Sequence, residues 1–223
     1  MENNTVTIQS IEQITHDVLK IVTAKPKGYA YTPGQATEIS VNSEGWREIK
    51  KPFTFTGLPT EDHLEFTIKT YPERKGVTNE LLQLKPYDEL IVHEVFGAIA
   101  YKGEGVFIAG GAGVTPFISI FRHLQANHLI GKNRLLFANK TKSDIILEKE
   151  FTEMLGNAFT NILSDEHTEG CANGMIDEAF LTNNIEDFHQ PFYVCGPPPM
   201  MEAVLKLLNQ LGVPENLITK EGI

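Results

Sequence analysis

Hydrophobic and polar positions follow different rhythms in the two halves of the chain. Up to about residue 102, apolar and polar residues alternate in short runs, as in strands whose successive side chains point to opposite faces of a sheet. The clearest runs are residues 5–8, 37–41, 53–56 and 64–68, separated by turn-forming stretches rich in glycine and proline. Short strands at this spacing predict an antiparallel β-barrel or sandwich, with one short helix over residues 77–84.

From residue 105 onward, short apolar runs alternate with segments of helical periodicity. A strand over 105–110 is followed by a helix over 115–129, and the same order then repeats along the chain. The repeats are residues 134–139 and 144–155, 159–165 and 175–184, 191–196 and 199–212, with a last strand over 216–221. Strands that alternate with helices predict a parallel doubly wound α/β sheet. We therefore expect two domains, an N-terminal antiparallel β-barrel over 1–102 and a C-terminal α/β domain over 103–223.

Composition and charge argue against some classes of binding partner and some cellular locations. Hydrophobic residues make up 41% of the chain and charged residues 22%, which is ordinary for a globular protein. The net charge of -10 argues against nucleic acid or an anionic membrane as partner, since both require clustered lysine and arginine. No apolar run approaches the ~20 residues that span a bilayer, and the first residues do not read as a signal peptide. We therefore expect a cytoplasmic protein with no membrane insertion.

The segment AGGAGVTP ends the first strand of the predicted α/β domain. Gly110, Gly111 and Gly113 allow a tight turn and close approach of the backbone to a ligand. Thr115 is a suitable helix N-cap and Pro116 a suitable first helical residue, so the turn would open a helix N-terminus toward a phosphate. A dinucleotide site and a merely tight strand–helix turn are both compatible with this pattern.

Two departures weaken the dinucleotide interpretation when it rests on the pattern alone. Pro116 stands where the third glycine of the usual dinucleotide fingerprint would be. The strand after the first helix ends in Asn139, which is not an acidic residue that could hold a ribose.

The segment CGPPPMM ends a later strand, at the same carboxyl edge of the predicted sheet. Ligands of doubly wound sheets bind beyond this edge, so Cys195 and Gly196 should face one crevice with the first glycine segment. The three prolines from Pro197 onward restrict the path of the backbone after the cysteine. The alternative is a small buried core thiol, and Met200 and Met201 are expected to pack rather than contact a ligand. The chain has only two cysteines, which suggests neither a disulfide framework nor an iron–sulfur cluster.

The N-terminal half offers two further candidates. The segment KPFTFT places Lys51, Phe53 and Thr54 close together, with the last two on opposite faces of a strand. Its alternative is an ordinary barrel strand that ends in a solvated lysine. A turn at Gly76 followed by Thr78 as N-cap would expose amide groups to an anion. Two phosphate-binding helix starts, one in each domain, fit a protein that binds two nucleotides.

Six short segments occur in the order typical of the ferredoxin–NADP reductase superfamily, which contains flavodoxin reductases and cytochrome b5 reductases. The segments are PGQ, KPFTFT, GVTNEL, FG, GGAGVTP and CGPPPM. The chain resembles this superfamily over nearly its whole length, and RLLFANKTKSDIILEKEF is similar to cytochrome b5 reductases in particular. The resemblance implies an N-terminal flavin-binding barrel and a C-terminal pyridine-nucleotide domain.

The resemblance also assigns roles around the flavin. Lys51 would contact the pyrophosphate, Phe53 would stack on the ring system, and the Thr54 hydroxyl would hydrogen-bond near flavin N5, which makes Thr54 one of two expected catalytic residues. Amides of the second segment would hold the pyrophosphate and favour FAD over FMN. The full expected flavin set is Lys51, Pro52, Phe53, Thr54, Lys69, Gly76, Val77, Thr78 and Phe96. Lysine is a point charge and lacks the bidentate contact of the arginine usual in the family, so weaker flavin binding is expected.

On the nucleotide side, the resemblance places Cys195 beside the nicotinamide as a positioning group and as the second expected catalytic residue. The expected nucleotide set is Gly111, Gly113, Thr115, Pro116, Asn139, Asp144, Cys195, Gly196, Pro197 and Met200. Lys140 and Lys142 would welcome the 2′-phosphate of NADPH, whereas Asp144 would repel it. Asp144 is also expected to cap the following helix. The matching aspartate of cytochrome b5 reductases favours NADH, so we expect NADH over NADPH.

Taken together, the resemblance implies an oxidoreductase that passes a hydride from NADH or NADPH to FAD and then electrons to a separate acceptor. Ferredoxin, flavodoxin, a cytochrome and free flavin remain open as acceptors, since no iron–sulfur module is recognised in the chain. The alternative is a flavin-binding electron-transfer subunit or regulatory module that acts only within a larger complex. Many family members end in an aromatic residue that covers the flavin, whereas this sequence ends in Ile223, so freer access of the nicotinamide is expected.

Overall fold

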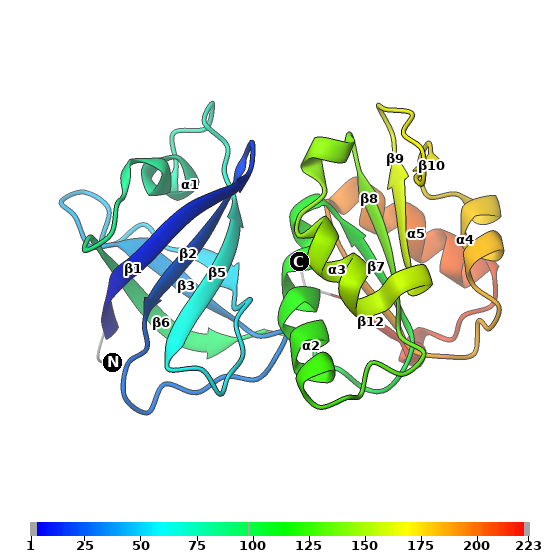
Figure 1. Ribbon diagram of the computed structural model, residues 1–223, viewed down its shortest axis with the longest axis horizontal. Coiled ribbons are helices and arrows are strands. Elements are labelled where there is room, and N and C mark those ends of the chain that lie inside the picture. The colour runs from blue at the N-terminus through cyan, green and yellow to red at the C-terminus, as the bar shows by residue number, and fades with distance from the viewer. Residues whose placement is uncertain (1–3, 98, 221–223) are drawn as a thin grey trace. The chain divides into compact units, whose positions relative to one another are not determined.

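The computed structural model describes residues 4–97 and 99–220, so the expectation for Ile223 lies outside the described residues. The chain forms two compact units (Figure 1). The first unit contains the chain up to Ala100 together with Thr115–His123, and the second contains Tyr101–Val114 and the chain from Leu124 onward. The domain boundary expected between residues 102 and 103 stays a prediction, because this grouping by contacts places one later helix with the first unit.

The first unit is built on an antiparallel barrel, which confirms the expected fold class. Its six strands occur in the order β4-β3-β6-β1-β2-β5, and a bridge between Phe55 and Phe66 joins the two ends. The strands are β1 (Asn4–Thr15), β2 (Val18–Ala24), β3 (Ala36–Val41), β4 (Lys51–Thr54), β5 (His63–Lys69) and β6 (Glu89–Phe96). The alternating pattern produces this sheet because every second side chain enters the core, where Ile8, Ile21 and Ile39 are fully buried.

A short helix closes one side of this core, as the sequence predicts. The helix α1 (Val77–Glu80) continues into the 3₁₀ turn η1 (Leu81–Gln83). Val77 and Leu81 are buried four residues apart, on one face of the helix, and both belong to the core of the barrel. The tighter 3₁₀ geometry ends the helix earlier than the expected residue 84.

The second unit contains a parallel six-stranded sheet in the order β10-β9-β8-β7-β11-β12. Its strands are β7 (Val106–Gly110), β8 (Arg134–Asn139), β9 (Phe159–Leu163), β10 (Ala172–Asn173), β11 (Phe192–Cys195) and β12 (Ile218–Lys220). The chain proceeds from β7 outward through β8 and β9 to β10, and then returns to β11 on the other side of β7. The order therefore reverses between β7 and β11, which is where doubly wound sheets bind ligands.

Helices follow the strands at the positions that the periodicity predicts. They are α2 (Thr115–Ala126), α3 (Glu148–Leu155), α4 (Glu178–Asn184) and α5 (Pro198–Gln210), with 3₁₀ turns η2 (Gly111–Val114), η3 (Lys142–Asp144), η4 (Gly156–Ala158) and η5 (Glu215–Leu217). In Figure 1, α3 lies on one face of the parallel sheet, and α4 and α5 lie on the other. Met201, Val204 and Leu208 form the buried stripe of α5 and pack with Ile108 and Leu136 of the sheet.

Among the described residues, no helix has both the length and the apolar character that crossing a bilayer requires.

Candidate functional site

The two glycine-containing segments picked out from the sequence meet in the second unit. Strands β7 and β11 are neighbours, and Cys195 pairs in register with Ala109. A Cβ placed on Gly113 would lie 2.5 Å from the carbonyl carbon of Cys195 and 2.6 Å from Cα of Gly196. The backbones of the two segments are therefore in direct contact, at the point where the strand order reverses.

Most of these glycines are required by packing between the segments. A Cβ on Gly110 would lie 3.0 Å from Cδ of Pro197, and a Cβ on Gly196 would lie 2.8 Å from Cε of Met200. Met200 thus packs over both glycines, as expected for this methionine. Gly111 differs, because its φ of +50° suits glycine while a Cβ there would meet nothing within 4 Å. The open space at this edge lies beside Gly111.

The helix after β7 begins earlier than expected. Residues Gly111–Val114 already form a 3₁₀ turn that runs directly into α2 at Thr115. The prediction of Thr115 as an N-cap is therefore wrong, because helical conformation starts at the end of the strand rather than at the threonine. The amide groups without intrahelical partners at such a start belong to the first residues of the 3₁₀ turn. The role of Thr115 and Pro116 in nucleotide binding stays a prediction.

Cys195 is the last residue of β11 and is 2% exposed. It lies on the same face of the sheet as Tyr193, whose ring stacks on Phe107 at a centroid distance of 4.2 Å. The burial of Cys195 agrees with the interpretation as a packed core thiol. Its place at the end of the strand agrees with the other interpretation, in which it positions the nicotinamide. The other cysteine, Cys171, lies in a different loop, and burial raises the pKa of its thiol.

Two buried asparagines lie near the carboxyl edge of the same sheet. Asn139 ends β8 and is 8% exposed, and within the described residues neither Nδ2 nor Oδ1 of its side chain has a hydrogen-bond partner. On β9, Oδ1 of Asn161 is also unpartnered, and the register places both side chains on one face. A buried amide group without a partner costs about 1–3 kcal/mol, so such groups are usually satisfied by a ligand or ordered water.

These amides fit a pyridine nucleotide at the carboxyl edge of the sheet, since a ribose offers hydroxyl groups to both donors and acceptors. Asn139 belongs to the expected set, whereas Asn161 was missed. A single polar residue inside a short strand carries no sequence signal that would distinguish it from a solvated position. Only the pairing of β8 with β9 brings it onto the same face of the sheet as Asn139, where it lies beside Phe137.

Asp144 takes part in the capping box of the 3₁₀ turn η3, whereas the sequence predicts that it caps the following helix. It is the last residue of the 3₁₀ turn η3, and α3 begins only at Glu148, after Leu147 has adopted a left-handed φ of 53°. The Asp144 carboxylate accepts hydrogen bonds from the amide of Thr141 at 2.9 Å and from the Thr141 hydroxyl at 2.7 Å. The prediction that Asp144 opens the following helix is wrong, because the Thr141–Asp144 spacing forms its own capping box first.

The expected flavin residues lie on neighbouring strands of the barrel. Ala36 of β3 pairs with Thr54 of β4 on one side and with Phe96 of β6 on the other, so the KPFTFT and FG segments meet in one row. Phe53 is partly buried against the barrel core, and Phe96 is 44% exposed. The strand that carries Thr54 is the first in the strand order, where an edge position tolerates the missing amide of the proline before Phe53.

The two lysines of the expected flavin set lie in different surroundings. Lys51 is exposed at the start of β4. Lys69 ends β5 opposite Val18, and its ammonium group forms an ion pair with Asp17 at 2.8 Å. Lys69 therefore does not lie in the row of residues that contains Thr54 and Phe96. The contact of Lys69 with a flavin stays a prediction.

Gly76, rather than Thr78, is the N-cap of α1, so the expected cap position is wrong by two residues. The Gly76 carbonyl accepts hydrogen bonds from the amides of Asn79 and Glu80 at 3.0 and 3.1 Å. Its φ of -148° is extended backbone that any residue adopts, and a Cβ there would meet nothing within 4 Å. Neither the backbone conformation nor the packing of the described residues requires glycine here, and the space beside the helix start is open. An open helix start is compatible with a phosphate group, and the contact of this segment with the pyrophosphate of FAD stays a prediction.

Gly76→Ala should separate folding from flavin binding. We expect the variant without flavin to unfold within a few degrees of wild type. Alanine lowers the entropy of the unfolded chain, which stabilises the fold by about 0.4–1 kcal/mol, but it is a poorer N-cap than glycine by a similar amount. We expect FAD affinity to fall about tenfold, since the added methyl group enters the space beside the helix start. Flavin titration followed by fluorescence measures this, with Gly45→Ala, at another open glycine of the first unit, as the control. Unchanged FAD affinity would show that this helix start does not face the flavin.

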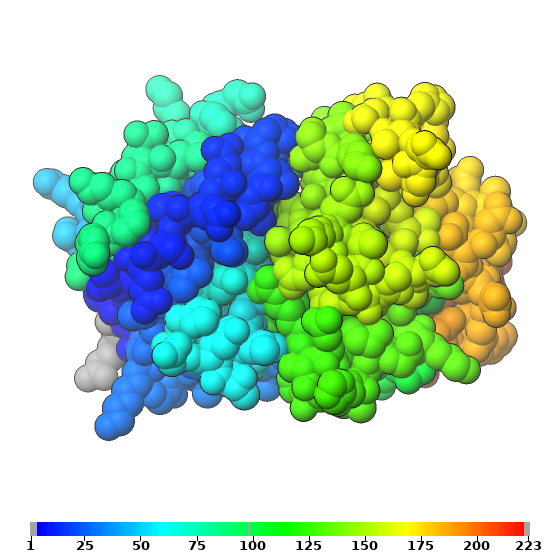
Figure 2. Space-filling model, viewed as in Figure 1, coloured from blue at the N-terminus to red at the C-terminus, as the bar shows by residue number. Residues whose placement is uncertain are grey.

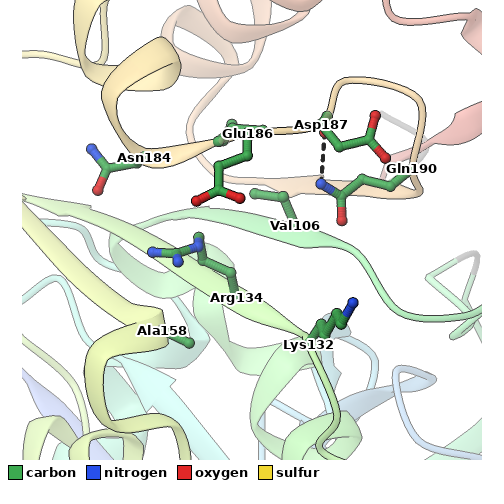
Figure 3. Close-up of a pocket in the computed structure, with 9 residues that line it drawn as sticks. Val106, Lys132, Arg134, Ala158, Asn184, Glu186, Asp187 and Gln190 are labelled. Atoms are coloured by element: carbon green, nitrogen blue, oxygen red, sulfur yellow. Dashed lines mark hydrogen bonds between the residues drawn. The ribbon is translucent and has the colours of Figure 1, made fainter.

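The pocket shown in Figure 3 lies at the opposite, amino edge of the parallel sheet. It has a volume of about 430 Å³ and is lined by the starts of β7 and β8 and by the segment after α4. Arg134 and Glu186 point toward one another across it, and the side chain of Gln190 donates a hydrogen bond to the carbonyl of Asp187 at 2.6 Å (Figure 3). None of the expected site residues lines this pocket.

Comparisons with known proteins agree with this geometry in both units. The profile of the FAD-binding domain family matches residues 3–94, and that of the oxidoreductase NAD-binding domain family matches residues 107–206. The chain is 28% identical to NADH-cytochrome b5 reductase 2 of Mycosarcoma maydis, over 89% of this chain and 63% of that protein. It is 29% identical to the reductase component of propane 2-monooxygenase from Rhodococcus jostii (strain RHA1), over 95% of this chain and 61% of that protein.

The chain thus spans about three fifths of the length of these two relatives. Among solved structures, a ferredoxin NADP+ reductase from Neisseria gonorrhoeae with bound FAD and NADP has the same fold. The TM-score is 0.85 at 15% identity, and the match covers 99% of this chain and 98% of that one. With an FAD-binding domain followed by a pyridine-nucleotide-binding domain in this fold, the chain belongs to the ferredoxin–NADP reductase superfamily.

Proposed function

We propose that the chain is an FAD-dependent oxidoreductase that takes a hydride from NADH and passes electrons to a separate acceptor. The contact between the Gly113 turn and the Cys195–Gly196 backbone, at the point where the strand order reverses, supports this most directly. It places a buried thiol at the strand edge where doubly wound sheets hold nucleotides. The reductase names of both sequence relatives are in keeping with the proposal.

On the flavin side, the proposed roles follow the row of β4, β3 and β6. The Thr54 hydroxyl would donate or accept a hydrogen bond at the reacting edge of the ring, and the exposed part of Phe53 would cover one ring face. Lys51 would neutralise pyrophosphate charge, and the amides after Gly76 would bind the phosphate oxygens. Pro52, Lys69 and Phe96 complete the proposed contacts. Bound FAD would supply the exchange between two-electron and one-electron chemistry.

On the nucleotide side, the proposed roles centre on the strand ends. Amides of the turn that contains Gly111 and Gly113, followed by Thr115 and Pro116, would bind the pyrophosphate of NADH. Asn139 would hydrogen-bond the adenosine ribose. Cys195, backed by Gly196, Pro197 and the packed Met200, would fix the depth at which the nicotinamide lies, and it is not proposed as a nucleophile.

The acceptor is proposed as a protein with a one-electron centre, such as a ferredoxin, a flavodoxin or a cytochrome, in the cytoplasm. One sequence relative also supports a second candidate function for this chain. A reductase component of a monooxygenase is among the relatives, so the chain is also a candidate electron-transfer component of a larger oxygenase system. Steady turnover with NADH and a small artificial acceptor, without any partner protein, would favour the autonomous enzyme.

Cys195→Ser tests the proposed positioning role. We expect flavin reduction by NADH to slow about 10–100-fold while FAD content stays near the wild-type value, because losses of positioning appear in the chemical step. Stopped-flow absorbance of the flavin measures the rate, and Cys171→Ser, at the partly exposed thiol, is the matched control. Reduction of the Cys195→Ser variant at the wild-type rate would favour the alternative of a purely structural core thiol.

The identity of the flavin is tested independently of turnover. Denaturing the purified or reconstituted protein and chromatographing the released cofactor should yield FAD. FMN would contradict the proposed pyrophosphate contact at Gly76, and absence of flavin after reconstitution would contradict the proposed function.

A further inference from the structure

The pocket at the amino edge of the parallel sheet combines buried apolar side chains with charged groups of both signs (Figure 3). Val106 and Ile185 line it and are buried. Lys132 and Arg134 lie on one side of it, and Glu186 lies on the other. In Figure 2, α4 and the segment after it, in orange, form part of the surface of the second unit. Lys132 and Glu186 are exposed, so the charged groups of the pocket can be reached from solvent.

The loop that carries the two cations is fixed by a buried side chain between them. Asn133 is fully buried, and its Oδ1 accepts a hydrogen bond from the amide of Gly105 at 3.0 Å. Its Nδ2 donates to the carbonyl of Ile130 at 2.8 Å and to the hydroxyl of Tyr101 at 3.0 Å. A buried polar group that is satisfied on both sides holds its backbone in one arrangement. Both cations therefore extend from backbone that is ordered before any ligand binds.

The opposite side of the pocket is also held by hydrogen bonds within its own segment. The side-chain amide of Gln190 donates to the carbonyl of Asp187 at 2.6 Å, and the carboxylate of Asp187 accepts from the amide of His189 at 2.7 Å. These bonds use polar groups of Asp187 and Gln190 but not the carboxylate of Glu186. Glu186 is therefore the carboxylate on this side that is available to a ligand.

The charged groups of the pocket do not neutralise one another. Arg134 and Glu186 point toward one another, yet no ion pair joins them in the part of the chain that the structure describes (Figure 3). The guanidinium group of Arg134 makes only a long hydrogen bond, of 3.5 Å, to the carbonyl of Asn157. Lys132 has no ion pair with any other described residue. The pocket thus presents positive and negative groups that stand apart.

We propose that this pocket binds a small zwitterion of dipeptide size, with its carboxylate at Lys132 and Arg134 and its ammonium group at Glu186. A simple anion would meet the like charge of Glu186, and a simple cation would meet two cationic side chains, so only a ligand with both charges is complementary to both sides. Because the two sides stand apart, the charges of the ligand must be separated by several atoms, as they are in a dipeptide.

The size and lining of the pocket agree with such a ligand. A volume of about 430 Å³ lies within the roughly 300–1,000 Å³ typical of small-molecule sites. Val106 and Ile185 suit an apolar side chain of the ligand. Since the pocket and the proposed nucleotide site lie at opposite edges of the sheet, the inference does not depend on the proposed function.

Three probes that differ in charge test the proposal by calorimetric titration into the full chain at low salt. Alanyl-leucine carries both charges, N-acetyl-alanyl-leucine keeps only the carboxylate, and alanyl-leucinamide keeps only the ammonium group. We expect alanyl-leucine to bind about tenfold more tightly than either of the others, because each missing charge removes the attraction of one side of the pocket.

Variants of the charged residues assign each end of the ligand. Glu186→Gln should weaken binding of alanyl-leucine about tenfold and change that of N-acetyl-alanyl-leucine less than about threefold. Arg134→Gln should weaken binding of both carboxylate-bearing probes about tenfold, and Lys132→Gln, in an exposed loop, should act in the same direction. The matched controls are Glu153→Gln and Lys149→Gln, from an exposed pair on α3, which should change no affinity. Thermal unfolding shows that each variant is folded.

Equal affinity of wild type for alanyl-leucine and for either singly charged probe would overturn the inference, because one side of the pocket would then contribute nothing. Failure of alanyl-leucine to bind would overturn it as well. So would an affinity for alanyl-leucine that Glu186→Gln and Lys132→Gln leave unaltered. None of these results bears on flavin reduction by NADH, which is measured separately.

Discussion

Gly113→Ala is expected to slow flavin reduction by NADH about 100-fold or more while leaving the flavin bound. The new methyl group would overlap the backbone of Cys195 and Gly196, with contacts of 2.5 and 2.6 Å to backbone carbon atoms. Because backbone cannot rotate out of the way, the ends of β7 and β11 would have to move apart by about 1 Å. A misplacement of that size costs about two orders of magnitude in rate when reacting groups must be aligned.

The matched control is Gly156→Ala, in the same unit but outside the proposed nucleotide site, and it should reduce its flavin at the wild-type rate. Its positive φ imposes strain of roughly 1–2 kcal/mol on alanine, but its Cβ would meet nothing within 4 Å. Rapid mixing with NADH measures the rate, and chemical reduction by dithionite shows that the flavin itself remains reducible. If Gly113→Ala reduced its flavin at the wild-type rate with NADH, contact between the two strand ends would be irrelevant to hydride transfer.

Arg122→Ala is expected to lower the free energy of unfolding by about 3–5 kcal/mol. Arg122 lies in the part of α2 that belongs to the first unit, and it forms an ion pair with Glu65 of β5. Glu65 is 9% exposed and also accepts a hydrogen bond from the Thr56 hydroxyl at 2.8 Å. Removing the guanidinium would leave a buried carboxylate without its counterion, which is among the costlier single changes.

Chemical denaturation measures this loss, and the midpoint of thermal unfolding should fall by roughly 10 °C. The control is Lys149→Ala, which breaks the exposed pair with Glu153 and should change stability by less than about 1 kcal/mol. The double variant Arg122→Met with Glu65→Leu should recover most of the loss, since it removes both charges together. A loss below about 1 kcal/mol for Arg122→Ala would contradict the description of this pair as buried and mutually dependent.

The fold could be predicted because its signals are local. Period-two alternation marks the barrel strands, and apolar strands alternating with helical stripes such as Met201, Val204 and Leu208 mark the parallel sheet. The strand β10 was not expected, because two residues, Ala172 and Asn173, are too short for any periodicity. Their strand character comes only from pairing with β9.

The site could be predicted in its main segments and not in its details. The glycine and proline residues located both strand ends correctly. None of the three predicted helix caps, Thr78, Thr115 and Asp144, caps the helix that the sequence predicts for it. Helix α1 begins after an extended glycine, and α2 continues directly from a 3₁₀ turn. Asp144 belongs to a separate 3₁₀ turn that precedes α3. Asn161 gains its position through the pairing of β9 with β8, which no local pattern in the sequence encodes.

The central claim is that this chain itself moves a hydride from NADH to bound FAD. Anaerobic mixing of the FAD-loaded protein with NADH, and separately with NADPH, tests it most directly by following the absorbance of the oxidised flavin. The account predicts rapid, complete loss of that absorbance with NADH and slower loss with NADPH. A flavin that stays oxidised with both nucleotides, yet is reduced by dithionite, would contradict it.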